Sequence, residues 1–359
     1  MRVLDGVLAG AVTLTLALTG VVATPARQSA RPVAFDAVPA STGATTIAVW
    51  SGDRQTFGSP GRAQRWVNIL GNVSDADGIA SLSFRLNSGT SRPLSIGPDT
   101  RRLQDAGDFN VEIGFHELVP GDNTVAIRAQ DTTGAVTTRT VVAHNVAGQT
   151  WPKTYSVDWG SVANVQTAAQ IVDGRWTRSN RGARTAQVGY DRLLGIGDFV
   201  AWDDYEVVVP ITVHRVDTRG YAAPAYGPGV GLLFRWTGHY DTADNSQPRW
   251  GYQPLGSLGW YRWRTDGTQQ LQLTDEQGKV RASTTALQLA TGTKYIFKMR
   301  VETKSNGPFY RLKAWKAGTK QPGWMLKRQE SFTDPQVGSF LLVAHYVDAT
   351  FGDVKVRPL

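Results

Sequence analysis

The chain has 359 residues, a net charge of +8 and no cysteine. This length accommodates two domains with cores of their own, and the lack of cysteine excludes disulfides, thiol nucleophiles, cysteine-ligated metals and a cysteine-linked lipid anchor. The 38 glycines and 17 prolines, without a long amphipathic helical pattern, predict an all-β protein with many turns.

The first thirty residues have the features of an export signal. Arg2 precedes an apolar run from Val7 to Ala23, which ends in a small-residue cleavage pattern. Glycine and threonine dilute this run, unlike a membrane span of about 20 residues. We predict a signal peptide and leader over residues 1–30, an unstructured leader over 31–45, and a secreted protein, extracellular or periplasmic, without a membrane span after cleavage. An uncleaved N-terminal anchor is the alternative.

The positive charge is confined to the second half of the chain. Residues 31–147 carry ten Arg, no Lys and eleven Asp or Glu, whereas residues 148–359 carry 26 basic and 18 acidic residues. Such a field favours acidic partners. Because a secreted protein meets polysaccharides more often than nucleic acid, we expect a polysaccharide or cell-surface glycan as the partner, no nucleic acid, and a monomeric chain.

Residues 46–147 alternate between apolar and polar in short runs separated by turn residues, which predicts a Greek-key sandwich. Together with Asp77-Gly78-Ile79 and Gly121-Asp122-Asn123, these runs resemble bacterial Ig-like or fibronectin III-like modules. In that family the modules are mostly spacers or adhesion units. Asp75 and Asp77 have the side chains of a calcium site, but an ordinary turn explains them better. The predicted strands include residues 66–70, 82–86, 109–113 and 124–129.

Strand patterns continue through residues 148–359. Tyr205 to His214 alternates with one apolar face, Val230 to Trp236 predicts a strand buried on both faces, and residues 295–304 and 309–316 predict a hairpin. Residues 337–346 and 350–356 are predicted to close the sheet.

These runs and the final Phe351-Gly352-Asp353-Val354 resemble the concanavalin A-like lectin/glucanase jelly rolls, in particular laminin G-like modules. The resemblance implies a larger jelly-roll sandwich with a glycan-facing concave sheet. It requires no cofactor but leaves room for a structural calcium ion near the terminal strands.

Residues 230–264 hold the densest group of aromatic and arginine side chains. Sugar rings stack on aromatic faces while their hydroxyls need directional partners. Core packing is the competing explanation for any single ring. The residues predicted to bind carbohydrate are Arg235, Trp236, His239, Tyr240, Arg249, Trp250, Tyr252, Trp260 and Trp263, with Arg262 and Arg264 as further charged partners.

Known catalytic patterns of this fold are absent from the sequence. A laminarinase-type site needs three alternating carboxylates, but Asp204 and Glu206 are followed by Val208. The His and Tyr of a jelly-roll alginate lyase have no counterpart. The leading hypothesis is therefore a secreted, non-catalytic carbohydrate-binding protein for a polysaccharide, with an acidic one favoured by charge. A glycoside hydrolase or polysaccharide lyase using Asp203, Asp204 or Glu206 with His239 is the second hypothesis, and an adhesion protein with a protein ligand is the third.

Overall fold

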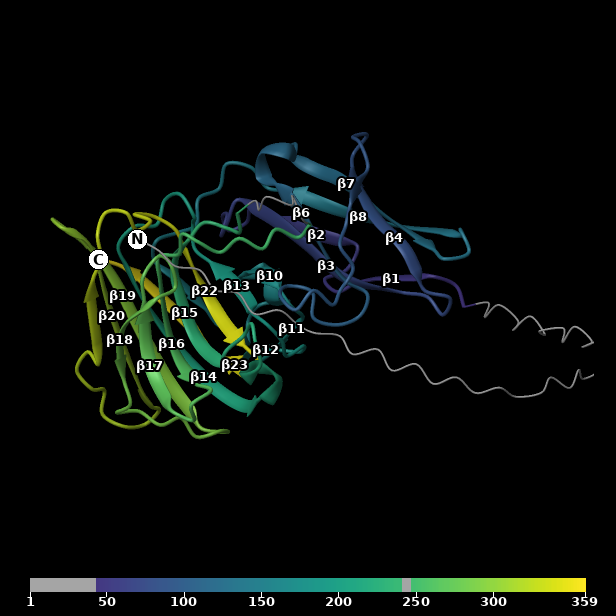
Figure 1. Ribbon diagram of the computed structural model, residues 1–359. Coiled ribbons are helices and arrows are strands. Elements are labelled where there is room, and N and C mark those ends of the chain that lie inside the picture. The colour runs from purple at the N-terminus through teal and green to yellow at the C-terminus, as the bar shows by residue number, and fades with distance from the viewer. Residues whose placement is uncertain (1–42, 241–246) are drawn as a thin grey trace, which may run out of the picture. The chain divides into compact units, whose positions relative to one another are not determined.

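The computed structural model describes residues 43–240 and 247–359 (Figure 1). The predicted signal peptide and nearly all of the predicted leader lie outside these residues. Residues Ser41–Leu359 form one compact unit. Its regular structure consists of strands and, in the described part, three short 3₁₀ helices, so the all-β prediction is confirmed. These helices are Phe115–Glu117, Val165–Thr167 and Thr218–Tyr221. No helix in residues 43–240 and 247–359 is long and apolar enough to cross a membrane.

The first eight strands form two facing sheets with a common core. One sheet has the order β1-β3-β6 and the other the order β2-β8-β7-β4-β5. Val67, Phe109 and Ile127 belong to the core between them. The strands are β1 (Thr46–Val49), β2 (Arg54–Phe57), β3 (Trp66–Ser74), β4 (Ile79–Leu86), β5 (Arg92–Pro93), β6 (Asp108–Gly114), β7 (Gly121–Asp131) and β8 (Val136–Asn145).

The remaining strands form a larger sandwich. Its seven-stranded sheet has the order β10-β13-β22-β15-β16-β17-β18, and its nine-stranded sheet contains β11-β12-β23-β14-β19-β20-β21 with β24 and β9 attached. The strands are β9 (Tyr155–Val157), β10 (Gln170–Asp173), β11 (Trp176–Ser179), β12 (Gly182–Thr185), β13 (Arg192–Ile196), β14 (Tyr205–Val216), β15 (Gly229–Trp236), β16 (Ser257–Trp263), β17 (Gln269–Thr274), β18 (Val280–Thr284), β19 (Lys294–Lys304), β20 (Gly307–Lys316), β21 (Leu326–Gln329), β22 (Ser339–His345), β23 (Val347–Phe351) and β24 (Val354–Pro358).

The alternation along β14, β19 and β20 places one face of each strand in the core of the larger sandwich. Val207 of β14 pairs with Met299 of β19, which pairs with Leu312 of β20. All three are fully buried and pack with Phe234 and Leu271 of the opposite sheet. The predicted strand at 205–214 and the predicted hairpin are confirmed, and so is the burial of β15 on both faces.

The C-terminal strands divide between the two sheets. β22 belongs to the seven-stranded sheet, whereas β23 and β24 pair with β14 in the nine-stranded sheet. Tyr346 makes the turn between them with a φ of 52°, in the left-handed region. The prediction that these segments close one sheet is therefore wrong: the chain crosses from one layer to the other at Tyr346.

Buried charges connect the two sandwiches within this unit. Arg102 donates from Nη1 to Glu112 Oε1 (2.7 Å) and from Nε to Asp173 Oδ1 (2.7 Å), and all three side chains are inaccessible. Asn110 Nδ2 also reaches the backbone oxygen of Val172 (3.1 Å). Buried ions are stable only when their hydrogen bonds are satisfied. Arg102 and Glu112 precede residue 148 and Asp173 follows it, so the two sandwiches share a specific polar contact. The division into separate domains at 46–147 and 148–359 stays a prediction.

Candidate anion-binding face

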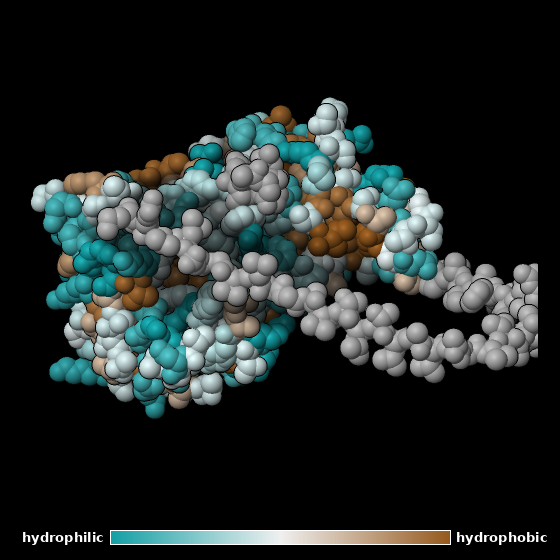
Figure 2. Space-filling view, viewed as in Figure 1, coloured by the Kyte–Doolittle hydropathy of each residue, from teal (hydrophilic) through white to brown (hydrophobic). Residues whose placement is uncertain are grey.

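The outward side of the nine-stranded sheet is strongly positive. Residues between the core positions point away from the core, because side chains alternate along a strand. On β19, β20, β21, β24 and the part of β14 before its bulge at Val213, these outward positions hold nine cations and two carboxylates, an excess of seven positive charges. We call this surface the cationic face. Its cations are Lys294, Lys298, Arg300, Lys304, Arg311, Lys313, Lys327, Lys355 and Arg357, and its carboxylates are Glu206 and Glu302. Figure 2 shows mostly hydrophilic residues, with a few hydrophobic ones among them, over the part of the surface where β19 and β20 are labelled in Figure 1.

A tryptophan lies among these cations. The connection between β20 and β21 is fixed against β20 by two hydrogen bonds, from Lys313 Nζ to Pro322 O (3.0 Å) and from Met325 N to Leu312 O (3.0 Å). This brings the Trp324 ring centroid to 4.7 Å from Lys313 Nζ and 5.6 Å from Arg300 Cζ. These are cation–π distances. Trp324 remains partly accessible, so the cationic face combines positive charge with an aromatic ring.

Glu206 is the first of the two carboxylates that organise the cations. Lys298 Nζ lies 2.7 Å and Arg357 Nε 2.8 Å from its Oε1, and Arg300 Nη2 lies 2.6 Å from its Oε2. Burial alone would raise the pKa of Glu206, but these three hydrogen bonds outweigh it and lower the pKa below its usual value. Glu206 therefore stays ionised at neutral pH and holds three cations in place.

Glu302 has the same role further along β19. Its carboxylate oxygens lie 3.0 Å from Arg300 Nη1, 2.7 Å from Arg311 Nη2 and 2.5 Å from Lys304 Nζ. Burial opposes its ionisation, but the hydrogen bonds from Lys304 and Arg300 lower its pKa. Because the two carboxylates share Arg300, together they hold five cations, and three positive charges of this group remain uncompensated.

Like charges face one another across neighbouring strands. Lys298 is paired in register with Lys313, and Arg300 with Arg311. Directly opposed like charges destabilise a sheet. Burial, followed by the charge of Lys298, also lowers the pKa of Lys313. The sheet therefore bears an electrostatic cost that a bound polyanion would relieve. Lysine and arginine with a neighbouring ring can hold carboxylate or sulfate groups while stacking on a sugar.

Most of the predicted carbohydrate-binding residues lie inside the protein. Arg235 and Trp236 are 0% exposed, and Trp260 and Trp263 are 8% and 7% exposed. Arg235 sits at a bulge in β15 with a φ of 54°, and its Nη2 contacts Asp204 Oδ1 (3.0 Å). Trp236 packs in a buried cluster on the outer side of the seven-stranded sheet. The prediction that these rings stack on sugar is wrong for Trp236, Trp260 and Trp263, because the ring faces are covered by the fold.

The other residues of that prediction lie where the first sandwich meets the seven-stranded sheet. The guanidinium of Arg101 lies 3.6 Å from the centroid of the Trp250 ring, and that of Arg65 lies 4.4 Å from Tyr240. Arg249 in turn covers Trp66 at 3.9 Å. Tyr252 packs against the same buried cluster as Trp236. In these contacts the arginine and aromatic side chains pack against one another within the unit. Of the further partners, Arg262 stacks on Trp260 at 4.1 Å and Arg264 is exposed beside Asp266, 3.2 Å away.

The residues of the enzyme hypothesis are dispersed. Glu206 lies on the outward side of the nine-stranded sheet, whereas His239 is fully buried with its Nε2 at 3.1 Å from Asp173 Oδ2. Asp203 pairs with Lys153 (2.7 Å) and Asp204 accepts from Thr303 N (2.8 Å). Glu206 and His239 therefore cannot serve one site in this structure, and the ionised Glu206 is a poor general acid.

Asp75 and Asp77 form a turn. Asp75 Oδ1 accepts from Asp77 N (2.8 Å), and its Oδ2 accepts from Thr45 Oγ1 (2.7 Å). Both oxygens of Asp75 are therefore engaged within the protein. Near the terminal strands, Asp353 Oδ1 accepts from Trp159 N (3.1 Å), which fixes the start of the larger sandwich to its end.

Comparisons with known proteins give distant likenesses only. No family model matches the sequence, and no curated protein matches it. An endo-β-1,4-mannanase from Thermotoga petrophila is 11% identical, with a TM-score of 0.24 over 31% of this chain and 22% of that one; the chain thus spans less than a quarter of that protein. The calcium-bound exoplasmic/lumenal domain of VIP36 is 10% identical, with a TM-score of 0.37 over 58% of this chain and 92% of that one. A carbohydrate-binding module of the β-sandwich superfamily is 11% identical, with a TM-score of 0.18 over 88% and 95%. Likenesses with such low TM-scores say nothing about the ligand or activity of this chain.

Proposed function

We propose that this protein is a secreted, non-catalytic carbohydrate-binding protein, and that its cationic face binds an acidic polysaccharide. The observation that carries the proposal is the register of β19 and β20, which sets Lys298 against Lys313 and Arg300 against Arg311. Glu302 compensates the Arg300–Arg311 pair only in part, and no carboxylate is common to Lys298 and Lys313 among the ion pairs of the described residues, so repulsion remains in both pairs. Binding of a polyanion explains both.

The arrangement suits a linear polymer with a charge on each repeat. The cations lie on four strands of one sheet, β19, β20, β21 and β24, so they can contact several carboxylate or sulfate groups at once. Trp324 supplies a ring among them at distances of 4.7–5.9 Å from four cations. Charge would supply affinity that falls with salt, and ring stacking would supply a component that persists in salt.

Affinity electrophoresis of the full chain tests this proposal. Gels contain polygalacturonate, alginate, chondroitin sulfate or neutral dextran, at low and high salt. We expect retardation by at least one acidic polymer and none by dextran. The variant Lys298→Ala/Arg311→Ala should lose most of this retardation.

The matched control is Arg178→Ala/Arg181→Ala, which removes the same charge from exposed positions around the β11–β12 turn. This control should keep the retardation of the unmodified chain. Equal losses in both double variants would show that only net charge matters and would contradict a specific face. The absence of retardation by every polymer would overturn the proposal and favour a protein ligand.

A further inference from the structure

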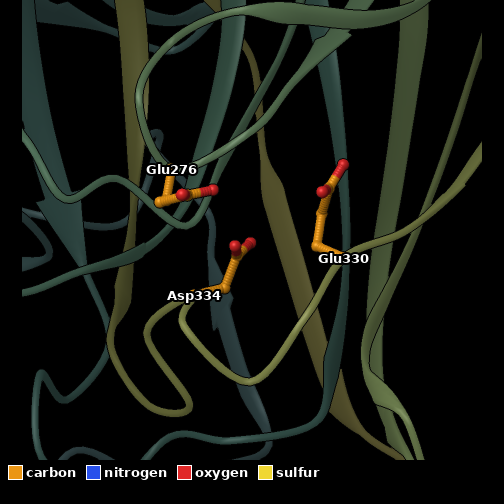
Figure 3. A group of neighbouring side chains, drawn as sticks. All are labelled: Glu276, Glu330 and Asp334. Atoms are coloured by element: carbon orange, nitrogen blue, oxygen red, sulfur yellow. The ribbon is translucent and has the colours of Figure 1, made fainter.

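Three carboxylates converge where the edges of the two large sheets approach one another. Glu276 lies in the β17–β18 turn, and Glu330 and Asp334 lie between β21 and β22. One oxygen from each side chain lies within 4.8 Å of the other two. Glu330 and Asp334 are buried and Glu276 is partly exposed. Figure 3 shows Glu276 and Asp334 extending into the same space, with Glu330 across from them.

Asp334 has no partner in this arrangement. It is 2% exposed, and no hydrogen-bond donor among the described residues reaches either of its carboxylate oxygens. A buried, unpaired carboxylate is among the most costly groups in a protein.

The neighbouring cations do not compensate Asp334. Arg328 Nε pairs with Glu330 Oε1 (2.8 Å), and Arg281 Nε lies 3.8 Å from the same oxygen and 3.7 Å from Asp275 Oδ2. The segment that carries Asp334 is held in place, because the next residue, Pro335, accepts a hydrogen bond from Nη1 of the buried Arg235 (3.1 Å). Asp334 therefore faces the other carboxylates from a fixed backbone.

The spacing of the three oxygens suits a hard divalent cation. Three points no more than 4.8 Å apart have a common centre within about 2.8 Å of each, since the largest such triangle has a radius of 4.8/√3. Calcium is bound by carboxylate oxygens at about 2.3–2.6 Å in flexible geometry, so small side-chain adjustments complete the shell. Magnesium requires about 2.0–2.1 Å and strict octahedral geometry, which fits the wider spacing less well.

We propose that Glu276, Glu330 and Asp334 bind one calcium ion. The unpartnered, buried Asp334 points to this ligand, because a cation would satisfy both of its oxygens and remove the repulsion among the three carboxylates. The ion would link the β17–β18 turn in one sheet to the segment after β21 in the other. Its role would be to hold the edge of the sandwich closed, and this proposal does not depend on the cationic face.

Calorimetric titration of the chelator-treated full chain with calcium chloride tests this proposal, with thermal unfolding as a second readout. We expect about one ion bound per chain and a rise in Tm of several degrees with calcium, and a smaller rise with magnesium. Asp334→Asn should abolish calcium binding. It should still fold, because the amide removes a buried charge and donates to Glu276, so its Tm without calcium should equal or exceed that of the unmodified chain.

Two further variants keep the test decisive. Glu276→Gln changes the partly exposed member and should weaken calcium binding at least tenfold, whether or not the Asp334 variant folds. Asp266→Asn, in the exposed β16–β17 turn, should leave binding unchanged. Absence of calcium binding at millimolar concentration in the unmodified chain, or undiminished binding in Asp334→Asn or Glu276→Gln, would overturn the proposal.

Discussion

Arg300 on β19 and Arg311 on β20 lie directly opposite one another in the sheet and share the carboxylate of Glu302, one from each side. Lys298 and Lys313 form the next such pair along the strands, without a carboxylate common to both among the ion pairs of the described residues. On the outer side of the sheet, the carboxylates thus compensate only part of the repulsion between like charges.

Removing one charge of the Lys298–Lys313 pair should weaken polysaccharide binding without lowering the stability of the fold. Lys313→Met keeps the aliphatic volume beneath Trp324 but removes a cation whose pKa is lowered by burial and by Lys298. We expect the free energy of unfolding to change by less than about 1 kcal/mol, because relief of the repulsion from Lys298 offsets the lost hydrogen bond to Pro322 O, while the affinity for an acidic polysaccharide falls. Urea denaturation and polymer titration measure the two effects. A clear loss of stability would show that Lys313 has a structural role instead.

Two tryptophans should respond in opposite ways to substitution by alanine. Trp324→Ala removes a partly exposed ring from the cationic face, so it should weaken the part of polysaccharide binding that persists in salt and change stability little. Trp236→Ala empties a fully buried position and should cost about 3–5 kcal/mol. Binding by the folded fraction of the Trp236 variant should remain. A loss of polysaccharide binding in Trp236→Ala, with binding kept in Trp324→Ala, would instead support sugar stacking by the aromatic residues of 230–264.

Acid should release the cations that Glu206 holds. The folded-state pKa of Glu206 is below its usual value, so its contribution to stability is complete above the unfolded-state pKa of about 4.3 and is lost as pH falls through the folded-state value. Urea midpoints of the unmodified chain and of Glu206→Gln, measured between pH 3 and 7, should differ most at neutral pH and converge in acid. A constant difference across this range would contradict the ionised state of Glu206.

The buried contact between the two sandwiches should be sensitive to the loss of its cation. Arg102→Ala leaves Glu112 and Asp173 buried without their partner, which should cost about 3–5 kcal/mol. Calorimetry of the unmodified chain should show one cooperative transition, because this network joins the sandwiches. A loss below about 1 kcal/mol would mean that water replaces the guanidinium without difficulty.

The sequence predicted the strands of the larger sandwich because their pattern is local. Apolar residues at every second position of 205–213 and 297–301 are enough to assign a buried face, and β14 and β19 confirm it. The same alternation places Lys298 and Arg300 on the outward side. The signal for the cationic face was therefore present in the sequence, in two adjacent strands whose outward residues have the same charge.

Burial of the 230–264 aromatics could not be predicted in the same way. Their outer side is covered by residues far away in the chain: Trp66 donates from Nε1 to His239 O (2.7 Å), and Arg101 lies on Trp250. Alternation tells which residues share a face, but not whether another part of the chain packs on that face. The same limit applies to Asp334, whose carboxylate neighbour Glu276 comes from another connection.

Lysine acetylation of the full chain with and without an acidic polysaccharide, read by mass spectrometry, locates the binding surface on the protein. We expect Lys294, Lys298, Lys327 and Lys355 to become protected when the polymer binds. Lys153 and Lys279, which lie outside the cationic face, should react at unchanged rates. Equal protection at all of these lysines, or protection confined to Lys153 and Lys279, would contradict the assignment of binding to this face.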